Sequence, residues 1–360
     1  MRKFAFILHP IVADDIARKF KFTAKWSDAW KERLVRLLPP LRVSHITGVK
    51  SPHAEVEGYF VACPLTSRQL LGSVPAAEAI KKIVQAGRVA EKLGAEIVGL
   101  GALTSVVGDA GLTVAEKLNI GVTTGNSYTV ATALMAARLA AAKMQIKIAD
   151  AQVVVVGATG SIGQVCARLM AKEAARVTLV ARNLERLQAV RERIYAESGT
   201  MTYVSDDVDA SLKNADIVIA VTSALDCVVD PRLLKPGAIV CDVARPRDVS
   251  EEVARLRDDV LIVDGGVVEV PGPVDFGFNF GFPPRMAYAC MAETMLLALE
   301  GKVADFSLGR DIKLEQVEEI TRLAEKHQFK LAGFRSFERA VTDEKIAAIR
   351  ERARAKRAAD

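Results

Sequence analysis

A short glycine-rich segment near the middle of the chain restricts the fold more than any other feature. It occupies residues 157–163, follows the apolar run Val153 to Val156 and precedes a helical pattern. Gly157 permits a tight turn, Gly160 lets backbone approach a pyrophosphate, and Gly163 lets the helix pack closely on the strand. A strand, a glycine loop and a helix N-terminus in this order are typical of a dinucleotide-binding fold, because the free N–H groups of the helix bind phosphate. We expect the cofactor phosphates to contact Gly157, Thr159, Gly160, Ser161, Ile162 and Gly163.

Strand and helix patterns alternate on both sides of this loop. Beyond the loop, apolar runs predict strands at 177–180, 201–204, 216–221, 238–242 and 260–263. Together with Val153 to Val156 they predict a doubly wound parallel sheet with helical crossovers. Before the loop, strands are expected at 4–8, 41–47, 55–62, 96–100 and 120–123, and helices at 27–38, 75–93 and 112–118. The fold class is therefore α/β.

The length of 360 residues is comfortable for two domains. We expect an N-terminal α/β substrate domain at 1–125 and a connecting Ala-rich helix at 126–145. A Rossmann-type domain follows at 146–270, and a loop and helices at 271–360 return to the cleft. A helix is predicted from about Arg285 to Glu300, started by Pro283-Pro284, with further helices at 313–327 and 342–358.

Composition narrows the class of partner. The net charge of +5 is too small to argue for nucleic acid, and it is compatible with a phosphorylated cofactor. No segment is long and apolar enough to span a bilayer. The five cysteines have no metal-ligand or disulfide-framework spacing, and no cluster of histidine, cysteine and carboxylate suggests a metal. We expect a cytoplasmic protein with reduced thiols. The sequence does not decide the oligomeric state, and a homo-oligomer is one of the options.

The end of the second strand of the dinucleotide fold distinguishes NAD from NADP. An acid there would bind a ribose 2′-hydroxyl, but the chain reads Ala181-Arg182-Asn183, with Arg186 one turn later. Arginine suits a 2′-phosphate, which it binds by charge-assisted hydrogen bonds. We therefore predict NADP(H), bound with the help of Arg182, Asn183 and Arg186. Weaker candidates follow later strands, namely Thr222, Ser223 and Gly265.

One cysteine is a candidate nucleophile. Cys290 lies early in the helix predicted from about Arg285, where a thiolate gains from the helix dipole, although that effect fades after the first turn. A cysteine that faces a nicotinamide can attack an acyl thioester and hold the acyl group. The residues alone leave this reading open beside that of a buried core cysteine.

Several segments, in the same order and spacing, resemble the cyanobacterial long-chain acyl-[acyl-carrier-protein] reductases, which form fatty aldehydes. The resemblance runs from about residue 95 to 320, and the first 90 residues match only loosely. The loop Val270 to Phe282 departs from the family pattern, so acyl length and carrier stay open. The segments that carry the resemblance include 103–105, 123–129, 155–163, 181–187, 265–269, Ala289-Cys290-Met291-Ala292-Glu293 and Phe306-Ser307-Leu308-Gly309-Arg310.

The resemblance implies that Cys290 forms an acyl-enzyme on a fatty acyl thioester, carried by acyl carrier protein or coenzyme A, which NADPH then reduces to an aldehyde. The developing oxyanion needs donors, and the candidates are Thr124, Asn126 and Ser127, or backbone N–H groups at the start of the helix at 126–145. His9 is the histidine best placed to line a cleft, and we do not assign it as the proton donor.

Two other functions stay open. The first is a dehydrogenase of the shikimate or quinate type, which shares the two-domain layout, although its Asn-Val-Thr-x-Pro-x-Lys segment is absent and no Lys/Asp pair is placed for it. The second is a catalytically silent NADP-binding protein. Replacement of Cys290 separates both from an acyl-enzyme reductase.

Overall fold

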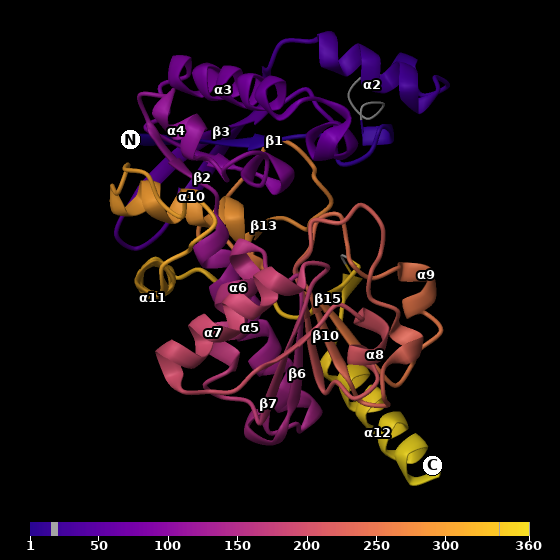
Figure 1. The fold of residues 1–360 in the computed structure, drawn as a ribbon. Helices are drawn as coiled ribbons and strands as arrows, with labels where there is room; N and C mark the ends of the chain where they lie inside the picture. The colour runs from indigo at the N-terminus through magenta and orange to yellow at the C-terminus, as the bar shows by residue number, and fades with distance from the viewer. Residues whose placement is uncertain (16–20, 338, 360) are drawn as a thin grey trace. The chain divides into compact units, whose positions relative to one another are not determined.

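The computed structural model describes residues 1–15, 21–337 and 339–359. The chain folds into two compact units, drawn together in Figure 1. Unit 1 comprises Met1–Tyr128 and Val268–Lys330, and unit 2 comprises Thr129–Val267 and Leu331–Asp360. Each unit is described by itself below. In the described part of the chain, no helix has the length and apolar character needed to cross a membrane.

Unit 1 is built on a five-stranded sheet with the order β2-β3-β1-β4-β5. Strand β2 is antiparallel to β3 and the other neighbours are parallel. The strands are β1 (Arg2–Leu8), β2 (Leu41–Lys50), β3 (Glu55–Ala62), β4 (Ile97–Leu100) and β5 (Gly121–Thr123). The central strands β1 and β4 are buried on both faces, which explains why their sequences are apolar runs without alternation.

Helices cover both faces of this sheet (Figure 1). Helix α3 lies on one face and helix α10 on the other. Helix α10 is apolar around nearly its whole circumference, as expected for a helix enclosed by protein on all sides. The helices of unit 1 are α2 (Asp28–Leu37), α3 (Ala76–Lys92), α4 (Leu112–Glu116), α10 (Ala289–Glu300) and α11 (Leu314–Lys326), and α5 (Asn126–Met144) continues from unit 1 into unit 2.

Unit 2 is a doubly wound parallel sheet with the order β11-β10-β9-β6-β7-β8. This order confirms the fold class expected from the sequence, since it is the strand order of a Rossmann fold. The direction of winding reverses between β6 and β9, which is the position where such folds bind ligands. The strands are β6 (Gln152–Val156), β7 (Arg176–Val180), β8 (Tyr203–Ser205), β9 (Ile217–Ala220), β10 (Ile239–Asp242) and β11 (Leu261–Asp264).

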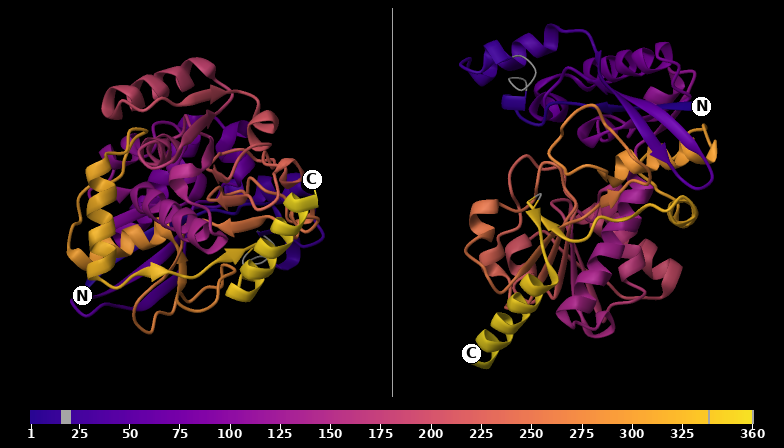
Figure 2. Two further views of the ribbon diagram at one scale, coloured as in Figure 1. Left: turned by 90° about the horizontal axis from the view of Figure 1, so that it is seen from below. Right: turned by 180° about the vertical axis from the view of Figure 1, so that it is seen from behind.

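The crossovers of unit 2 are helical, and the last helix, yellow in Figure 2, runs along the outside of the unit. It is fixed to α5 by an ion pair of 2.7 Å between Lys143 and Asp343. The helices are α6 (Ser161–Met170), α7 (Leu184–Ser198), α8 (Val208–Leu212), α9 (Glu251–Ala254) and α12 (Asp343–Ala359). Short strands complete the structure, namely β12 (Val267–Glu269), β13 (Met286–Tyr288), β14 (Lys330–Leu331), β15 (Arg335–Ser336) and β16 (Arg339–Ala340).

The start of helix α10 differs from the expectation. The predicted helix start at about Arg285 is wrong, because Arg285 has a left-handed φ of 67° and Met286–Tyr288 form strand β13. The carbonyl of Arg285 accepts a hydrogen bond of 2.7 Å from the Val270 N–H, which fixes the segment in an extended pairing. The helix begins only at Ala289. Cys290 is therefore its second residue, inside the turn where the helix dipole acts.

Candidate functional site

The glycine loop of unit 2 has the close backbone packing that a dinucleotide requires. Gly157 has a φ of 88°, and a Cβ there would lie 2.9 Å from the Val221 carbonyl oxygen at the end of β9. A Cβ on Gly163 would lie 2.3 Å from the Gly157 carbonyl oxygen, so only glycine lets α6 approach the loop. Gly160 is the N-cap of α6, followed by Ser161. The loop thus presents the N-terminus of a helix at the winding reversal of the sheet, which fits a pyrophosphate.

The end of β9 is held in place by buried carboxylates. The backbone N–H of Thr222 donates to Asp248 at 2.9 Å, and its hydroxyl donates to the same carboxylate. Burial raises the pKa of Asp248 to about 6, and burial also raises the pKa of Asp242, which accepts the Asp248 and Val249 N–H groups. The Thr222 hydroxyl therefore orients the loop, while Ser223 beside it is exposed.

The residues expected at the 2′-phosphate lie together at the end of β7. Arg182, Asn183 and Arg186 are all exposed. The Asn183 side chain accepts the Arg186 N–H at 2.8 Å and so caps α7. This contact brings the backbone of Arg186 to the start of the helix, one turn from Arg182. Gly265 lies past the end of β11, where a Cβ would lie 2.6 Å from Val243.

In unit 1, the segment around Cys290 packs directly on the Thr-Thr-Gly-Asn loop. Gly125 has a φ of 76°, and a Cβ on it would lie 2.3 Å from both the Cα and the Cβ of Cys290. No side chain larger than that of glycine fits this contact. The two segments that carry the family resemblance, separated by about 160 residues in the sequence, thus form one structure.

A buried carboxylate joins the same two segments. Glu293, one turn after Cys290 on α10, is fully buried. Its oxygens accept the Thr123 hydroxyl at 2.5 Å and the Tyr128 N–H at 2.7 Å. The Gly125 N–H provides a further hydrogen bond. Burial raises the pKa of Glu293 and these donors act in the opposite direction. No role for Glu293 is expected from the sequence, although an acid flanked by apolar residues within a helix is a recognisable signal.

The three residues expected to stabilise an oxyanion lie at this loop. The Thr124 hydroxyl donates to the Ser307 carbonyl, and the Ser307 hydroxyl donates to the Ser127 oxygen at 2.6 Å. Thr124, Asn126 and Ser127 are all buried. The Thr124 proton is therefore engaged within the protein, and both hydroxyls fix the loop against the segment at 306–308.

His9 lies beside the same region in neutral form. Its Nε2 atom accepts the Leu103 N–H at 3.2 Å, and its Nδ1 atom lies 2.9 Å from the Pro10 carbonyl, to which it donates. Burial lowers the pKa of His9 to about 4. It therefore positions the turn at Ala102–Ser105 and carries no positive charge near neutral pH.

Cys290 is partly accessible as a residue, and the surrounding protein still shifts the pKa of its thiol. Burial raises the pKa of the thiol to about 12. Backbone hydrogen bonds from Cys290, Met291 and Ala102 act in the opposite direction, because they stabilise a thiolate, whereas the charge of Glu293 raises the pKa further. The resting side chain is therefore a thiol.

This environment predicts an unusual pH dependence of alkylation. The pKa of Cys290 lies above the ordinary value of 9.0, so the thiolate fraction still rises about tenfold per pH unit between pH 7 and 10. The measurement is the rate of iodoacetamide labelling, assigned to Cys290 by peptide mass spectrometry. The exposed Cys227 is replaced by Ala to remove a competing thiol. A labelling rate that levels off below pH 9 would show an activated thiolate instead.

A row of aromatic side chains leads from the core of unit 1 to the start of α10. Phe60 contacts Phe276 and Phe280 at ring-centroid distances of 6.0 and 5.6 Å. The row continues from Phe280 to Phe282 at 5.9 Å and from Phe282 to Tyr288 at 4.7 Å. Tyr288 is the N-cap of α10, two residues before Cys290. The Phe-rich loop is thus partly core, at Phe276, and partly accessible further along.

Comparison with known families gives a match that lies within unit 2. Residues 138–264 match the family model described as shikimate / quinate 5-dehydrogenase, which covers most of unit 2 and none of the Cys290 segment. Among the residues that the structure describes, no group of three or more His, Cys, Asp or Glu side chains could hold a metal ion.

Two curated relatives match most of the chain. The long-chain acyl-[acyl-carrier-protein] reductase of Synechococcus elongatus is 30% identical over 335 residues, which are 88% of this chain and 94% of the reductase. The chain belongs to the family of this reductase. The aminotransferase PigE of a Serratia species is 34% identical over 310 residues, which are 84% of this chain. The chain spans only 35% of the length of PigE, about a third.

Among solved structures, the L-tryptophan dehydrogenase of Nostoc punctiforme aligns over 99% of this chain and 89% of its own, at 11% identity and a TM-score of 0.41. The glycine loop, the strand order and the family membership agree on one point. This member of the reductase family is an oxidoreductase of the Rossmann type, and its cofactor is NADP(H).

Proposed function

We propose that this chain reduces a fatty acyl thioester of acyl carrier protein or coenzyme A to an aldehyde, with Cys290 as the nucleophile. The observation that carries the proposal is the position of Cys290 in the first turn of α10, packed directly against Gly125 of the Thr-Thr-Gly-Asn loop. Membership of the reductase family over most of the chain supports it.

In the first step the Cys290 sulfur forms a bond to the carbonyl carbon of the thioester. The bond between that carbon and the carrier sulfur breaks, and the thiol proton of Cys290 passes to the departing carrier thiolate. The N–H groups of Cys290, Met291 and Ala102 stabilise the charge that develops on the attacking sulfur. Because the resting thiol has a high pKa, this stabilisation is needed during the step itself.

In the second step the acyl group leaves Cys290 as an aldehyde. NADPH, when bound, supplies the hydride that the acyl carbon requires. The chain holds the acyl group on Cys290 and returns the sulfur to its thiol form when the carbon–sulfur bond breaks and a proton is taken up. We propose that Thr124, Asn126 and Ser127 hold the loop that shapes the oxyanion site, with backbone N–H groups as the donors.

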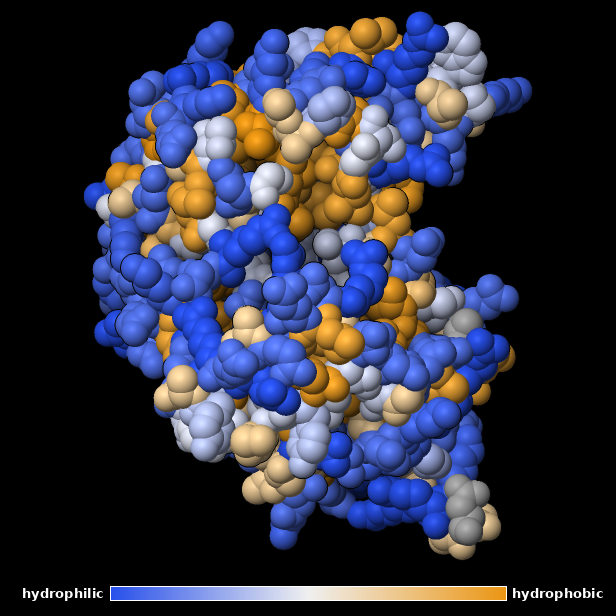
Figure 3. Space-filling view, in the orientation of Figure 1, coloured by the Kyte–Doolittle hydropathy of each residue, from blue (hydrophilic) through white to orange (hydrophobic). Residues whose placement is uncertain are grey.

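The acyl chain requires an apolar surface next to the nucleophile. We assign this role to the aromatic row that ends at Phe282 and Tyr288, where both side chains are half-buried. Figure 3 shows apolar side chains gathered over the upper part of the face, in the region where Figure 1 draws β1 and the segment that leads to β13. A chain of methylene groups gains about 0.8 kcal/mol for each group buried on such a surface.

For the cofactor we assign the 2′-phosphate to Arg182 and Arg186. The double variant with Ala at both positions is expected to raise the KM for NADPH about 10- to 100-fold, the loss of one to two charge-assisted hydrogen bonds. The KM for NADH should change little, and Lys172→Ala, an exposed control next to α6, should leave both values unchanged. Equal losses with both cofactors would place the 2′-phosphate elsewhere.

The direct test mixes the purified protein with NADPH and palmitoyl-coenzyme A or palmitoyl-acyl carrier protein, and measures hexadecanal by gas chromatography. The proposal expects aldehyde from at least one carrier. The absence of aldehyde from both, over several chain lengths, would overturn it. Oxidation of shikimate or quinate with NADP⁺ in the same assay would assign the alternative dehydrogenase activity.

A further inference from the structure

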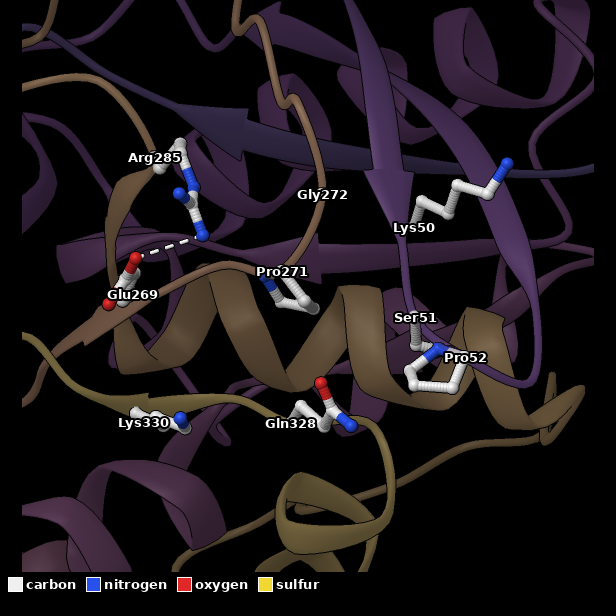
Figure 4. Close-up of a pocket in the computed structure, with 9 residues that line it drawn as sticks. All are labelled: Lys50, Ser51, Pro52, Glu269, Pro271, Gly272, Arg285, Gln328 and Lys330. Atoms are coloured by element: carbon white, nitrogen blue, oxygen red, sulfur yellow. Dashed lines mark ion pairs between the residues drawn. The ribbon is translucent and has the colours of Figure 1, made fainter.

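A second feature of unit 1 is a pocket of about 330 Å³ next to the segment that leads into α10. Figure 4 shows the residues that line it, which come from four segments of the chain. They include Lys50 and Ser51 at the end of β2, Glu269 at the end of β12, Arg285 before β13, and Lys330 in β14. Neither the glycine loop nor Cys290 lines this pocket.

The lining of the pocket is more cationic than anionic. Lys50, Arg285 and Lys330 contribute three positive charges, and two carboxylates pair with two of them: Glu269 with Arg285, and Glu55 outside the lining with Lys50 at 3.1 Å. Glu269 pairs with Arg285 at 2.9 Å, and both side chains are about half exposed. In Figure 4 this pair lies at one side of the pocket and Lys330 lies below it. The arrangement suits an anion that approaches from solvent and that can displace Glu269 from Arg285.

The backbone at Arg285 gives an independent reason to look for a ligand. Its φ of 67° is a conformation that glycine adopts freely and that costs other residues about 1 kcal/mol or more. The turn is fixed from both sides, because the Arg285 carbonyl accepts the Val270 N–H and the Met286 N–H donates to Pro283. A glycine would relieve the strain, so an arginine at this position indicates a use for its side chain.

The opposite wall of the pocket is rigid. The Ser51 oxygen lies 2.8 Å from Nδ1 of His327, whose Nε2 lies 3.0 Å from Glu300 on α10. Ser51 also accepts the N–H groups of His53 and Ala54, so its oxygen is occupied by structural contacts. We therefore read this serine as a fixed wall and not as a nucleophile. The cationic side chains of the pocket are the groups that can bind a ligand.

We propose that this pocket binds the phosphate of the 4′-phosphopantetheine arm that coenzyme A and acyl carrier protein share. The proposal rests on the thioester reductase function proposed above. A carrier remains in solvent while its arm enters the protein, so the phosphate at the base of the arm must be bound at an open, cationic site. Arg285, which is half exposed, and the exposed Lys330 provide such a site, with Lys50 at its edge paired to Glu55.

The spacing along the chain agrees with this assignment. Cys290 is the fifth residue after Arg285, and five extended residue steps span at most about 17 Å. The arm has roughly 13 bonds from phosphorus to sulfur, which by the same extended-chain measure is about 15 Å. A phosphate bound by Arg285 therefore leaves the thioester within reach of the Cys290 sulfur.

The experiment compares substrates with and without the phosphate. The value of kcat/KM is measured for palmitoyl-coenzyme A, palmitoyl-acyl carrier protein and palmitoyl-pantetheine, which lacks the phosphate. We expect the wild type to prefer each phosphate-bearing thioester at least 10-fold over palmitoyl-pantetheine. The variant Arg285→Gly, which relieves the backbone strain, should lose about 10- to 100-fold of this preference, the amount expected for one charge-assisted arginine contact. Loss with coenzyme A alone would assign the site to the nucleotide carrier, and loss with both would assign it to the shared arm.

Two further variants make the test specific. Glu269→Gln removes the carboxylate that competes for Arg285, so the preference for phosphate should rise about 3- to 10-fold. Lys92→Ala, an exposed control on α3, should leave it unchanged. A preference that is the same in Arg285→Gly as in the wild type would overturn the proposal. If no thioester yields aldehyde, the reductase function fails, and calorimetry with 4′-phosphopantetheine against pantetheine still tests the pocket, since equal affinities would overturn it.

Discussion

Replacement of Cys290 by Ala is expected to lower aldehyde formation by about 10³-fold or more, because it removes the only group proposed to form a bond to the substrate. NADPH should bind to the variant as tightly as to the wild type, since the glycine loop lies in the other unit. The measurement is kcat for hexadecanal formation, together with the fluorescence of bound NADPH.

Cys290→Ser and Cys227→Ala are the matched controls. The serine hydroxyl keeps the shape of the side chain but is a much weaker nucleophile, so this variant should be as inactive as Cys290→Ala. Cys227 is exposed and lies in unit 2, and its replacement should have no effect on kcat. Residual activity above about 10% in Cys290→Ala would mean that the acyl group is transferred without this thiol.

Replacement of Glu293 by Ala is expected to be the most destabilising single change in unit 1. It removes the carboxylate that accepts the Thr123 hydroxyl and the Tyr128 N–H in a fully buried site. At about 1 to 3 kcal/mol for each buried unsatisfied group, the free energy of unfolding should fall by roughly 3 kcal/mol or more. The measurement is urea unfolding followed by circular dichroism.

Glu300→Gln, on the same helix, is the control for this effect. Glu300 is partly exposed and pairs with Lys326 at 2.7 Å, so its replacement should cost about 1 kcal/mol or less. A similar loss in both variants would show that any carboxylate on α10 matters equally. If Glu293→Ala unfolds outright, Glu293→Gln, which keeps one acceptor, provides the comparison.

The direction of the pKa shift of Glu293 also determines how the stability of the protein depends on pH. Burial raises this pKa in the folded protein above the ordinary value of 4.5, so the native state binds the proton more tightly than the unfolded chain does. The contribution of Glu293 to stability is therefore greatest at low pH and falls as the pH rises from about 4.5 through the raised pKa. Glu293→Gln should lack this dependence.

The fold of unit 2 could be predicted in detail because local and global signals agree there. The run Val153 to Val156 is apolar without alternation, and Gly157, Gly160 and Gly163 each meet a backbone requirement that the structure shows. Alternation of strands and helices then leaves few topologies. The strand order of the Rossmann fold follows from these constraints.

The helix before Cys290 could not be placed correctly from the same kind of signal. Two prolines commonly precede a helix, but here Arg285 turns left-handed and Met286–Tyr288 pair with β12 instead. That pairing depends on β12, a segment separated from β13 in the sequence, so the local pattern around the two prolines does not reveal it. The consequence is functional, since it moves Cys290 into the first turn of its helix.

The contacts within the candidate site could not be predicted from the sequence either. Thr124 and Ser127 were identified as polar groups at a helix start, yet their hydroxyls bond to the segment at Ser307, about 180 residues later. Gly125 and Glu293 were visible only as parts of a family resemblance. Their roles depend on the packing of α10 against the loop, a tertiary contact between two distant segments.

The measurement that tests the central claim most directly is intact-protein mass spectrometry after mixing with palmitoyl-coenzyme A without NADPH. We expect the wild type to gain the mass of one palmitoyl group, to lose it as hexadecanal when NADPH is added, and Cys290→Ala to gain nothing. The same adduct on Cys290→Ala, or no adduct on the wild type with either carrier over several chain lengths, would contradict an acyl-enzyme at Cys290.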